Sequence, residues 1–230
     1  MSQITIYHGS QYIIEKPVFG EGNPRNDYGS GFYCTREIDL AKEWACTEEN
    51  DGFVNIYTLD INGLKVCRLL SKEFHLLNWL ALLLQNRYFR ISNDIAGSAK
   101  AYLISKFLPD VNDVDVIVGY RADDSYFSFA NSFLNNQISL EQLEAAMHLG
   151  DLGEQTVLMS EKAFSQIHFE GFEPADRKIH YPKRAARDKA ARQAYKEQRS
   201  LKQTLDAVYI LDILREGWDN NGTRLRRNIP

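Results

Sequence analysis

A histidine, a glycine and a serine stand together near the start of the chain, in the stretch IYHGS (6–10). Because glycine lets a ligand approach the backbone, the N–H and C=O of Gly9 can hold a planar amide through two hydrogen bonds. His8 can hydrogen-bond a sugar hydroxyl beside that amide, and Ser10 completes the cluster. The structural alternative is a histidine at the end of a strand, satisfied by a backbone carbonyl. The residues alone leave both interpretations open.

A second cluster is DYGSGFYCT (27–35), in which two glycines flank Ser30 and the aromatic residues Phe32 and Tyr33 follow. Such a segment can close over a ligand and stack an aromatic ring on it. A β-turn that leads into a core strand is the alternative.

The third cluster is Glu154-Gln155, which follows a glycine-containing loop and opens an apolar strand. A carboxylate there can hydrogen-bond a substrate, although most such glutamates are simply solvated. Strand alternation puts residues 154 and 155 on opposite faces, so only one of them can point into a site.

The elements that must position these clusters form an α+β pattern. Strands are expected at 4–10, 32–35, 113–120, 154–160 and 165–173, with a hairpin of 53–61 and 64–70 around Asn62-Gly63. Helices are expected after a Thr35 cap, in two or three pieces over 71–107, at 125–136, and at 139–150 with Gly150 as its stop. Strands do not alternate regularly with crossover helices, which favours α+β over α/β.

A basic segment runs from Pro182 to about Leu205, and its alanine-rich composition predicts one long helix with the proline at its first position. Such a helix can bind nucleic acid, bind an acidic partner, or be an exposed helix with excess charge. The candidate partner contacts are Lys183, Arg184, Arg187 and Arg192.

Composition sets wider limits. The chain has 230 residues, a formal net charge of -4 and 44% hydrophobic residues, which predicts a globular protein with one core and an appendage. The net charge gives no general case for nucleic acid, so any such surface is local. Three cysteines without paired ligand spacing argue against structural zinc and for a reducing compartment. We expect no metal, no membrane span, and a cytoplasmic protein or a secreted effector without a signal peptide.

Together, YHGS, YGSGFYCTREIDLAKEWA and GEQTVLMS resemble the three motifs of the diphtheria-toxin-like and poly(ADP-ribose) polymerase-like ADP-ribosyltransferases. More narrowly, about residues 4 to 175 resemble the bacterial ADP-ribosyltransferase-like proteins of the DUF3990 family. The resemblance implies a split β-sandwich core with inserted helices over residues 1–178. Residues 179–230 would be a basic helical extension.

The resemblance also implies a site for NAD⁺, as substrate, between two small sheets. His8 would hold the adenosine-side ribose, and the Gly9 backbone, helped by Ser10, would hold the nicotinamide carboxamide. Tyr33 would stack on the nicotinamide ring, and Trp44 would close the other side. Gly31 and Thr35 are further residues of the second motif implied to line the site.

The acidic residue of the late strand would hydrogen-bond the nicotinamide-ribose 2′-hydroxyl. Loss of nicotinamide leaves an oxocarbenium-like ribose, whose positive charge a nearby carboxylate or dipole stabilises. Glu154 takes this role if it aligns with the family's glutamate, and Gln155 takes it if the register is one residue later. The acid is slightly favoured here, and a single transfer is favoured over chain elongation.

Arg121, just after the strand 113–120, is a candidate contact for the acceptor or for phosphate, although its neighbours Asp123 and Asp124 are explained by a helix N-cap. The sequence thus predicts a mono-ADP-ribosyltransferase that modifies a protein or nucleic acid. By analogy it would be the toxin of a bacterial toxin-antitoxin or phage-defence pair, with a neutralising partner. The alternatives are an NAD⁺ glycohydrolase and a degenerate module that binds nucleic acid or protein.

Overall fold

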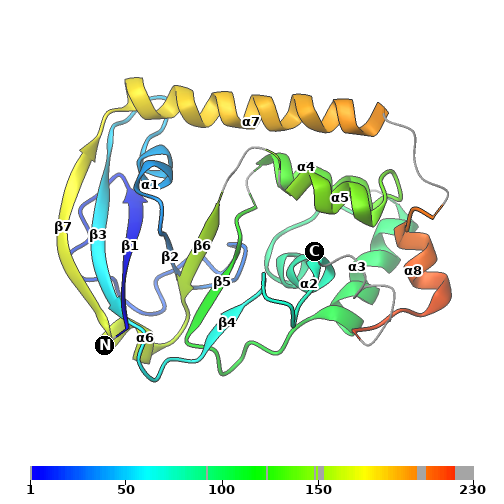
Figure 1. Cartoon of the computed structure of the whole chain (residues 1–230), viewed down its shortest axis with the longest axis horizontal. Helices are drawn as coiled ribbons and strands as arrows, with labels where there is room; N and C mark the ends of the chain where they lie inside the picture. The colour runs from blue at the N-terminus through cyan, green and yellow to red at the C-terminus, as the bar shows by residue number, and fades with distance from the viewer. Residues whose placement is uncertain are drawn as a thin grey trace. The chain divides into compact units, whose positions relative to one another are not determined.

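The chain folds into a mixed α+β structure, known from a computed structural model that describes residues 2–91, 93–122, 124–147, 149, 153–200 and 206–220. The described residues form one seven-stranded sheet and eight helices. The expected α+β class is confirmed. The strands are β1 (Gln3–Ser10), β2 (Phe32–Thr35), β3 (Gly52–Asp60), β4 (Val66–Arg68), β5 (Val116–Tyr120), β6 (Glu154–Leu158) and β7 (Ile167–Ala175) (Figure 1).

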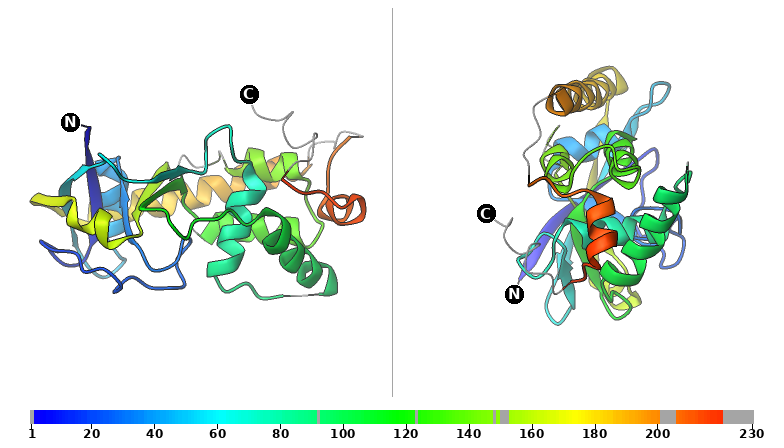
Figure 2. Two further views of the ribbon diagram at one scale, coloured as in Figure 1. Left: turned by 90° about the horizontal axis from the view of Figure 1, so that it is seen from below. Right: turned by 90° about the vertical axis from the view of Figure 1, so that its right-hand side faces the viewer.

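The chain divides into two compact units, each discontinuous in sequence. Unit 1 comprises Met1–Arg68, Val111–Arg121 and Leu152–Arg187, and it holds every strand together with α1 (Ile38–Ala45), α6 (Glu161–Ser165) and the first part of α7 (Arg177–Ser200). Unit 2 holds α2 (Leu76–Asn86), α3 (Asp94–Phe107), α4 (Asp124–Leu134), α5 (Leu140–Met147), α8 (Ile210–Glu216) and the rest of α7. In Figure 2 these helices can be found by their colours, which run from blue-green to red along the chain. The sequence analysis places a domain boundary after residue 178. The two units, in contrast, are groups of residues in mutual contact, and helix α7 contributes residues to both of them.

The sheet of unit 1 has the strand order β4-β5-β6-β2-β1-β3-β7. Neighbouring strands are antiparallel, apart from the parallel pair β4 and β5. Ile6, Phe32, Tyr57 and Leu158, from four different strands, are buried in one core cluster on one face of the sheet. Because only one face of each strand enters this cluster, apolar residues alternate with others along the strand, and this pattern makes the short strands around the candidate clusters recognisable in the sequence.

The predicted hairpin of 53–61 and 64–70 is wrong. Asn62-Gly63 does turn the chain, with Gly63 at φ 71°, but β3 pairs with β1 and β7 and thus has no edge left for β4. The turn is held instead by Gln166, whose Nε2 donates to the carbonyls of Asp60 and Asn62. β4 pairs in parallel with β5.

Helix α1 begins later than the sequence predicts. Thr35 is not its cap, because the N-cap residue is Glu37 and the Thr35 hydroxyl accepts a hydrogen bond from the Glu37 N–H at 3.1 Å. The helix packs closely on β1 and β3 (Figure 1) because glycines lie beneath it. A Cβ at Gly9 would lie 2.1 Å from the Ala41 carbonyl oxygen.

Helix α7 begins earlier than predicted. Its first residue is Arg177, so Pro182 lies inside the helix rather than at its first position. The backbone of Asp176 accepts from the N–H groups of Ile179 and His180, and its carboxylate accepts from Lys178 N, so the chain is already helical before the proline. The predicted end near residue 205 lies outside the described residues, as do Gly150 and Asp123. The other expected strands and helices, including the two helices within 71–107, are confirmed.

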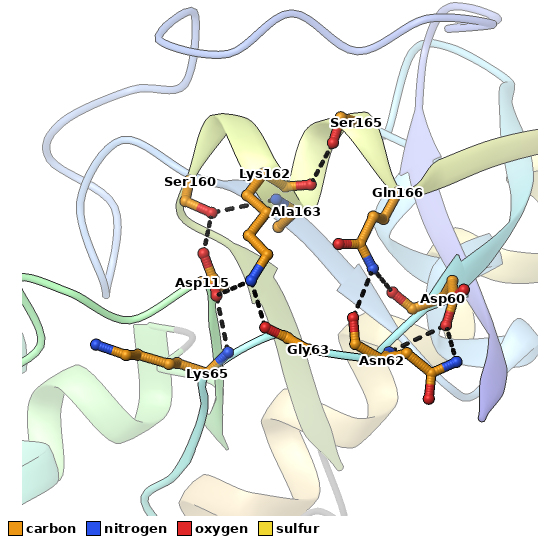
Figure 3. A network of polar contacts seen from close by, with 10 residues as sticks. All are labelled: Asp60, Asn62, Gly63, Lys65, Asp115, Ser160, Lys162, Ala163, Ser165 and Gln166. Carbon is orange, nitrogen blue, oxygen red and sulfur yellow. Dashed lines mark hydrogen bonds and ion pairs between the residues drawn. The ribbon is translucent and has the colours of Figure 1, made fainter. Parts of the chain in front are cut away.

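A polar network joins β5 to α6 and to the segment before β4 (Figure 3). The carboxylate of Asp115 accepts hydrogen bonds from Lys65 N at 2.7 Å and Ser160 Oγ at 2.5 Å, and Lys162 Nζ lies 3.9 Å from it. Burial raises the pKa of Asp115, but these hydrogen bonds and the Lys162 charge outweigh it and leave the pKa below its usual value. Lys162 also donates to the Gly63 carbonyl.

Unit 2 is a helical unit whose core is rich in leucine and phenylalanine. Leu80, Leu83, Phe107 and Phe129 are almost fully buried. The Asn78 amide donates to the Phe107 carbonyl at 2.8 Å and thereby satisfies a helix end. No helix in the described part of the chain has the length and apolar character that crossing a bilayer requires.

Candidate functional site

The three motifs lie on three neighbouring strands of unit 1, in the order β6, β2, β1. Thr35 of β2 stands opposite Gln155 of β6 on one side and Tyr7 of β1 on the other. Residues directly opposite each other share a face, so Gln155 and Thr35 lie on the same face as Tyr33, two residues from Thr35. His8 is directed to the other face, the one that carries Phe32.

The His8 ring is held in a defined position. Its Nδ1 lies 2.7 Å from the Tyr33 carbonyl oxygen, and the ring stacks on Phe32 with centroids 4.4 Å apart. Burial lowers the pKa of His8, and the hydrogen bond to Tyr33 opposes the shift only in part, so the neutral ring is favoured. A carbonyl can only accept, so Nδ1 carries the proton and Nε2 keeps an acceptor lone pair.

Gly9 and Ser10 have clear structural roles. Gly9 allows α1 to approach β1, since any side chain would collide with the helix backbone. The Ser10 hydroxyl accepts from Tyr12 N at 3.0 Å and turns the chain at the strand end. Residues 8–10 pair along β3, whereas the described pairing of β1 with β2 is at Tyr7 and Thr35.

The Tyr33 side chain is held in place by two hydrogen bonds of its hydroxyl group. Its hydroxyl donates to the Gly29 carbonyl at 2.7 Å and accepts from Tyr28 N at 2.9 Å, so the loop before β2 is organised around it. Gly31 lies where a Cβ would come within 2.4 Å of Val157 Cγ1, which explains the glycine without a ligand. Thr35 is fully buried with its hydroxyl engaged, so its contribution is to structure.

Trp44 and Arg121 come together although they are distant in the sequence. The Arg121 guanidinium carbon lies 4.4 Å from the Trp44 ring centroid, a cation–π contact. Trp44 Nε1 is buried and has no hydrogen-bond partner among the described residues. The side chain of Trp44 also lies close to Gly9, because its Cβ would be 3.0 Å from a Cβ added there.

Residues 154 and 155 differ sharply in their surroundings. Glu154 is exposed, whereas Gln155 is 3% exposed. The Gln155 amide nitrogen donates to Asp27 Oδ2 at 2.9 Å and to the Tyr120 carbonyl at 3.1 Å. Asp27 is itself buried. It is the first residue of the second cluster, DYGSGFYCT, but the sequence analysis gave it no role.

Residues 4–169 match the family model described as "Protein of unknown function (DUF3990)". The chain belongs to the DUF3990 family. No curated protein and no solved structure matches the chain. The expected family is therefore confirmed, and its description names no activity.

The basic helix of this DUF3990 protein is partly committed to internal ion pairs. Arg187 makes a two-point contact with the buried carboxylate of Glu43, with Nη2 2.8 Å from Oε1 and Nε 3.2 Å from Oε2. Arg192 pairs with Asp188 at 2.8 Å. Lys183 is exposed and Arg184 partly so. Arg187 therefore has a structural role that its place in a charged run did not reveal.

The part of the chain that the structure describes contains no group of three or more histidine, cysteine or acidic side chains arranged to hold a metal ion. Cys34, Cys46 and Cys67, all among the described residues, form no disulfide, and burial raises the pKa of Cys34 well above its usual value. The chemistry of the candidate site consequently rests on His8, Tyr33, the Trp44–Arg121 pair and Gln155 with Asp27.

Proposed function

We propose that this DUF3990 protein is an NAD-dependent mono-ADP-ribosyltransferase. The observation that carries the proposal is the convergence of three motifs, distant in the sequence, on the neighbouring strands β1, β2 and β6. Each motif resembles its counterpart in the diphtheria-toxin-like and poly(ADP-ribose) polymerase-like enzymes. The split sandwich of those enzymes is part of the proposal, and the limited pairing of β1 with β2 supports it.

The state of His8 suits a ribose contact. The neutral ring, anchored through Nδ1 to the Tyr33 carbonyl, presents Nε2 as an acceptor for a hydroxyl of the adenosine-side ribose. The same hydrogen bond links the first motif to the second. The side chains of His8 and Tyr33 lie on opposite faces where β1 pairs with β2, so the proposed site requires the two strands to diverge beyond the Tyr7–Thr35 pair, with the tyrosine ring stacking on nicotinamide.

In the proposed reaction the bond between ribose C1′ and nicotinamide breaks, and neutral nicotinamide leaves with both bonding electrons. The ribose becomes positively charged, so groups that present negative charge or an oriented dipole lower the barrier. Gln155 is on the Tyr33 face of the sheet, and Glu154 is on the other. An amide at this position supports transfer of a single ADP-ribose rather than chain growth.

A nicotinamide-release assay tests the proposal. The purified protein is incubated with labelled NAD⁺ and cell lysate, with and without nuclease. We expect label on a macromolecule and loss of at least about a hundredfold in rate for His8→Ala or Tyr33→Ala. His168→Ala, at an exposed position of β7, and Tyr88→Ala, at an exposed position of unit 2, are matched controls and should keep full activity.

The three readouts separate the candidate functions. Label that stays with protein indicates a protein acceptor, nuclease-sensitive label indicates nucleic acid, and free ADP-ribose alone indicates NAD⁺ hydrolysis. No nicotinamide release under any of these conditions would refute the proposal. A degenerate binding module then becomes the better interpretation.

The proposal extends to a toxin that acts in the bacterial cytoplasm and is neutralised by a partner protein, and family resemblance is its support. Induced expression should arrest bacterial growth, and His8→Ala should relieve the arrest while the protein remains abundant. Lys183 and Arg184 of α7 are the proposed contacts for an acidic acceptor or partner, because Arg187 and Arg192 are engaged in ion pairs. Growth arrest that persists in the His8→Ala variant would contradict the role as a toxin that acts through ADP-ribosyl transfer.

A further inference from the structure

A buried carboxylate and a buried amide form a pair, and the amide is that of Gln155, on the face of the sheet that carries Tyr33. Asp27 is 5% exposed and Gln155 is 3% exposed, and their side chains are joined at 2.9 Å. Asp27 belongs to the loop before β2 and Gln155 to the start of β6.

The hydrogen bonds fix which way the amide points. Both partners of the Gln155 nitrogen, the Asp27 carboxylate and the Tyr120 carbonyl, are acceptors, so the NH₂ group must face them. Its two hydrogens are then used. The oxygen Oε1 points the other way and has no hydrogen-bond partner among the described residues.

The carboxylate also changes the amide's charge distribution. A hydrogen bond to an ionised group is stronger than a neutral one, and in a buried setting it polarises the donor. The donor here is an amide N–H, so electron density moves toward Oε1. Gln155 then presents a stronger acceptor than an isolated glutamine would.

We propose that Asp27 is a positioning residue for the NAD⁺ reaction, acting through Gln155. It orients and polarises the amide so that Oε1 accepts a hydrogen bond from a hydroxyl of the nicotinamide ribose. This inference rests on the proposed transferase function. It assigns the anionic charge of the site to the loop before β2, and the contact with substrate to β6.

The step that the pair assists is balanced without any further reactant. The C1′–N bond breaks, its electron pair leaves with neutral nicotinamide, and the ribose carries one positive charge. A nucleophile of the acceptor then forms the new bond to C1′ and releases its proton to water. Oε1, facing the ribose, stabilises the charge while it exists.

The variant Asp27→Asn separates charge from shape. The asparagine oxygen can still accept from the Gln155 amide, so this hydrogen bond can remain while the negative charge is removed. We expect kcat for nicotinamide release to fall about tenfold to a hundredfold, with KM for NAD⁺ within about twofold. Asp113→Asn, at an exposed position before β5, is the control and should change neither constant.

A double variant tests the role more directly. In Asp27→Asn/Gln155→Glu the carboxylate moves to position 155 and the amide to position 27, so the side-chain hydrogen bond between them is kept with its parts exchanged, while the Tyr120 carbonyl loses its donor. We expect kcat to recover to within about tenfold of the unsubstituted protein, as oriented charge is restored. Gln155→Glu alone should be worse than the double variant, because it places two carboxylates side by side.

The outcomes are distinguishable. If the unsubstituted protein releases no nicotinamide, the proposed function and this inference both fail. If it is active, and Asp27→Asn keeps its kcat or the double variant is no better than Asp27→Asn, this inference alone fails. If Asp27→Asn unfolds, the decision passes to the double variant, and a folded but inactive double variant overturns the role of Asp27.

Discussion

The contact between Arg187 and Glu43 makes a sharp prediction about stability. Glu43 lies in α1, beside Trp44, and its side chain is 4% exposed. The Arg187 side chain is 25% exposed and meets the carboxylate at two points. Replacing Arg187 by methionine keeps the apolar stem but leaves a buried carboxylate without its main cationic partner.

The expected size of the effect follows from burial. Breaking a buried ion pair from one side costs about 3–5 kcal/mol, and the partial exposure of Arg187 argues for the lower end, about 3 kcal/mol. For a chain of this length, that loss lowers Tm by about 6–12 °C. Lys183→Met, on an exposed position of the same helix, should cost less than about 0.5 kcal/mol.

Thermal and urea unfolding measure these differences, and the double variant Glu43→Met/Arg187→Met completes the cycle. Removing both charges no longer leaves the Glu43 carboxylate buried without Arg187, so we expect the double variant to be more stable than Arg187→Met alone. An Arg187→Met variant that melts within about 2 °C of Lys183→Met would refute the structural role. Loss of salt-dependent nucleic-acid binding without loss of stability would instead make Arg187 a partner contact.

Three further predictions concern Gly9, Asp115 and Tyr33. Gly9→Ala should cost about 1–3 kcal/mol in unfolding free energy, since its Cβ would collide with α1, and an unchanged Tm would contradict that packing. The pKa of Asp115 is lowered on folding, so its contribution to stability is present above about pH 4 and is lost as pH falls through the lowered value. Stability measured by urea unfolding should therefore fall more steeply below about pH 4 in the unsubstituted protein than in Asp115→Asn, and equal slopes would contradict this. Tyr33→Phe should lose about 1 kcal/mol of stability, with its bonds to the loop, yet keep the nicotinamide release that Tyr33→Ala loses; equal loss would assign the role to the hydroxyl.

Most secondary structure could be predicted because its causes are local. The short apolar alternations of β1, β2 and β6 each lie within a few residues, and the helices of unit 2 show their own periodicity. The failures have causes outside the segment. β4 did not join β3 because β1 and β7 already occupy both edges of β3.

The distinction between local causes and distant causes applies to side chains as well. Nothing within the basic segment marks Arg187 apart from Arg184, because the difference is made by Glu43, far earlier in the chain. Asp27 is hidden in the same way, since the residue that gives it a role is Gln155. Runs of like charge and polar loops predict exposure on average, and their buried members are defined only by distant partners.

The choice between Glu154 and Gln155 depends on strand register. Alternation alone says that they face opposite ways, and the pairing of Gln155 with Thr35 puts Gln155 on the side of Tyr33. If the residue on that side is an amide, it contributes an oriented dipole, and any negative charge in the proposed site comes from another element. The loop before β2 carries Asp27 and also holds the Tyr33 hydroxyl through Gly29 and Tyr28. One short segment therefore fixes both the aromatic ring and the polarised amide, so a change in this loop should affect binding of nicotinamide and the rate of its release together.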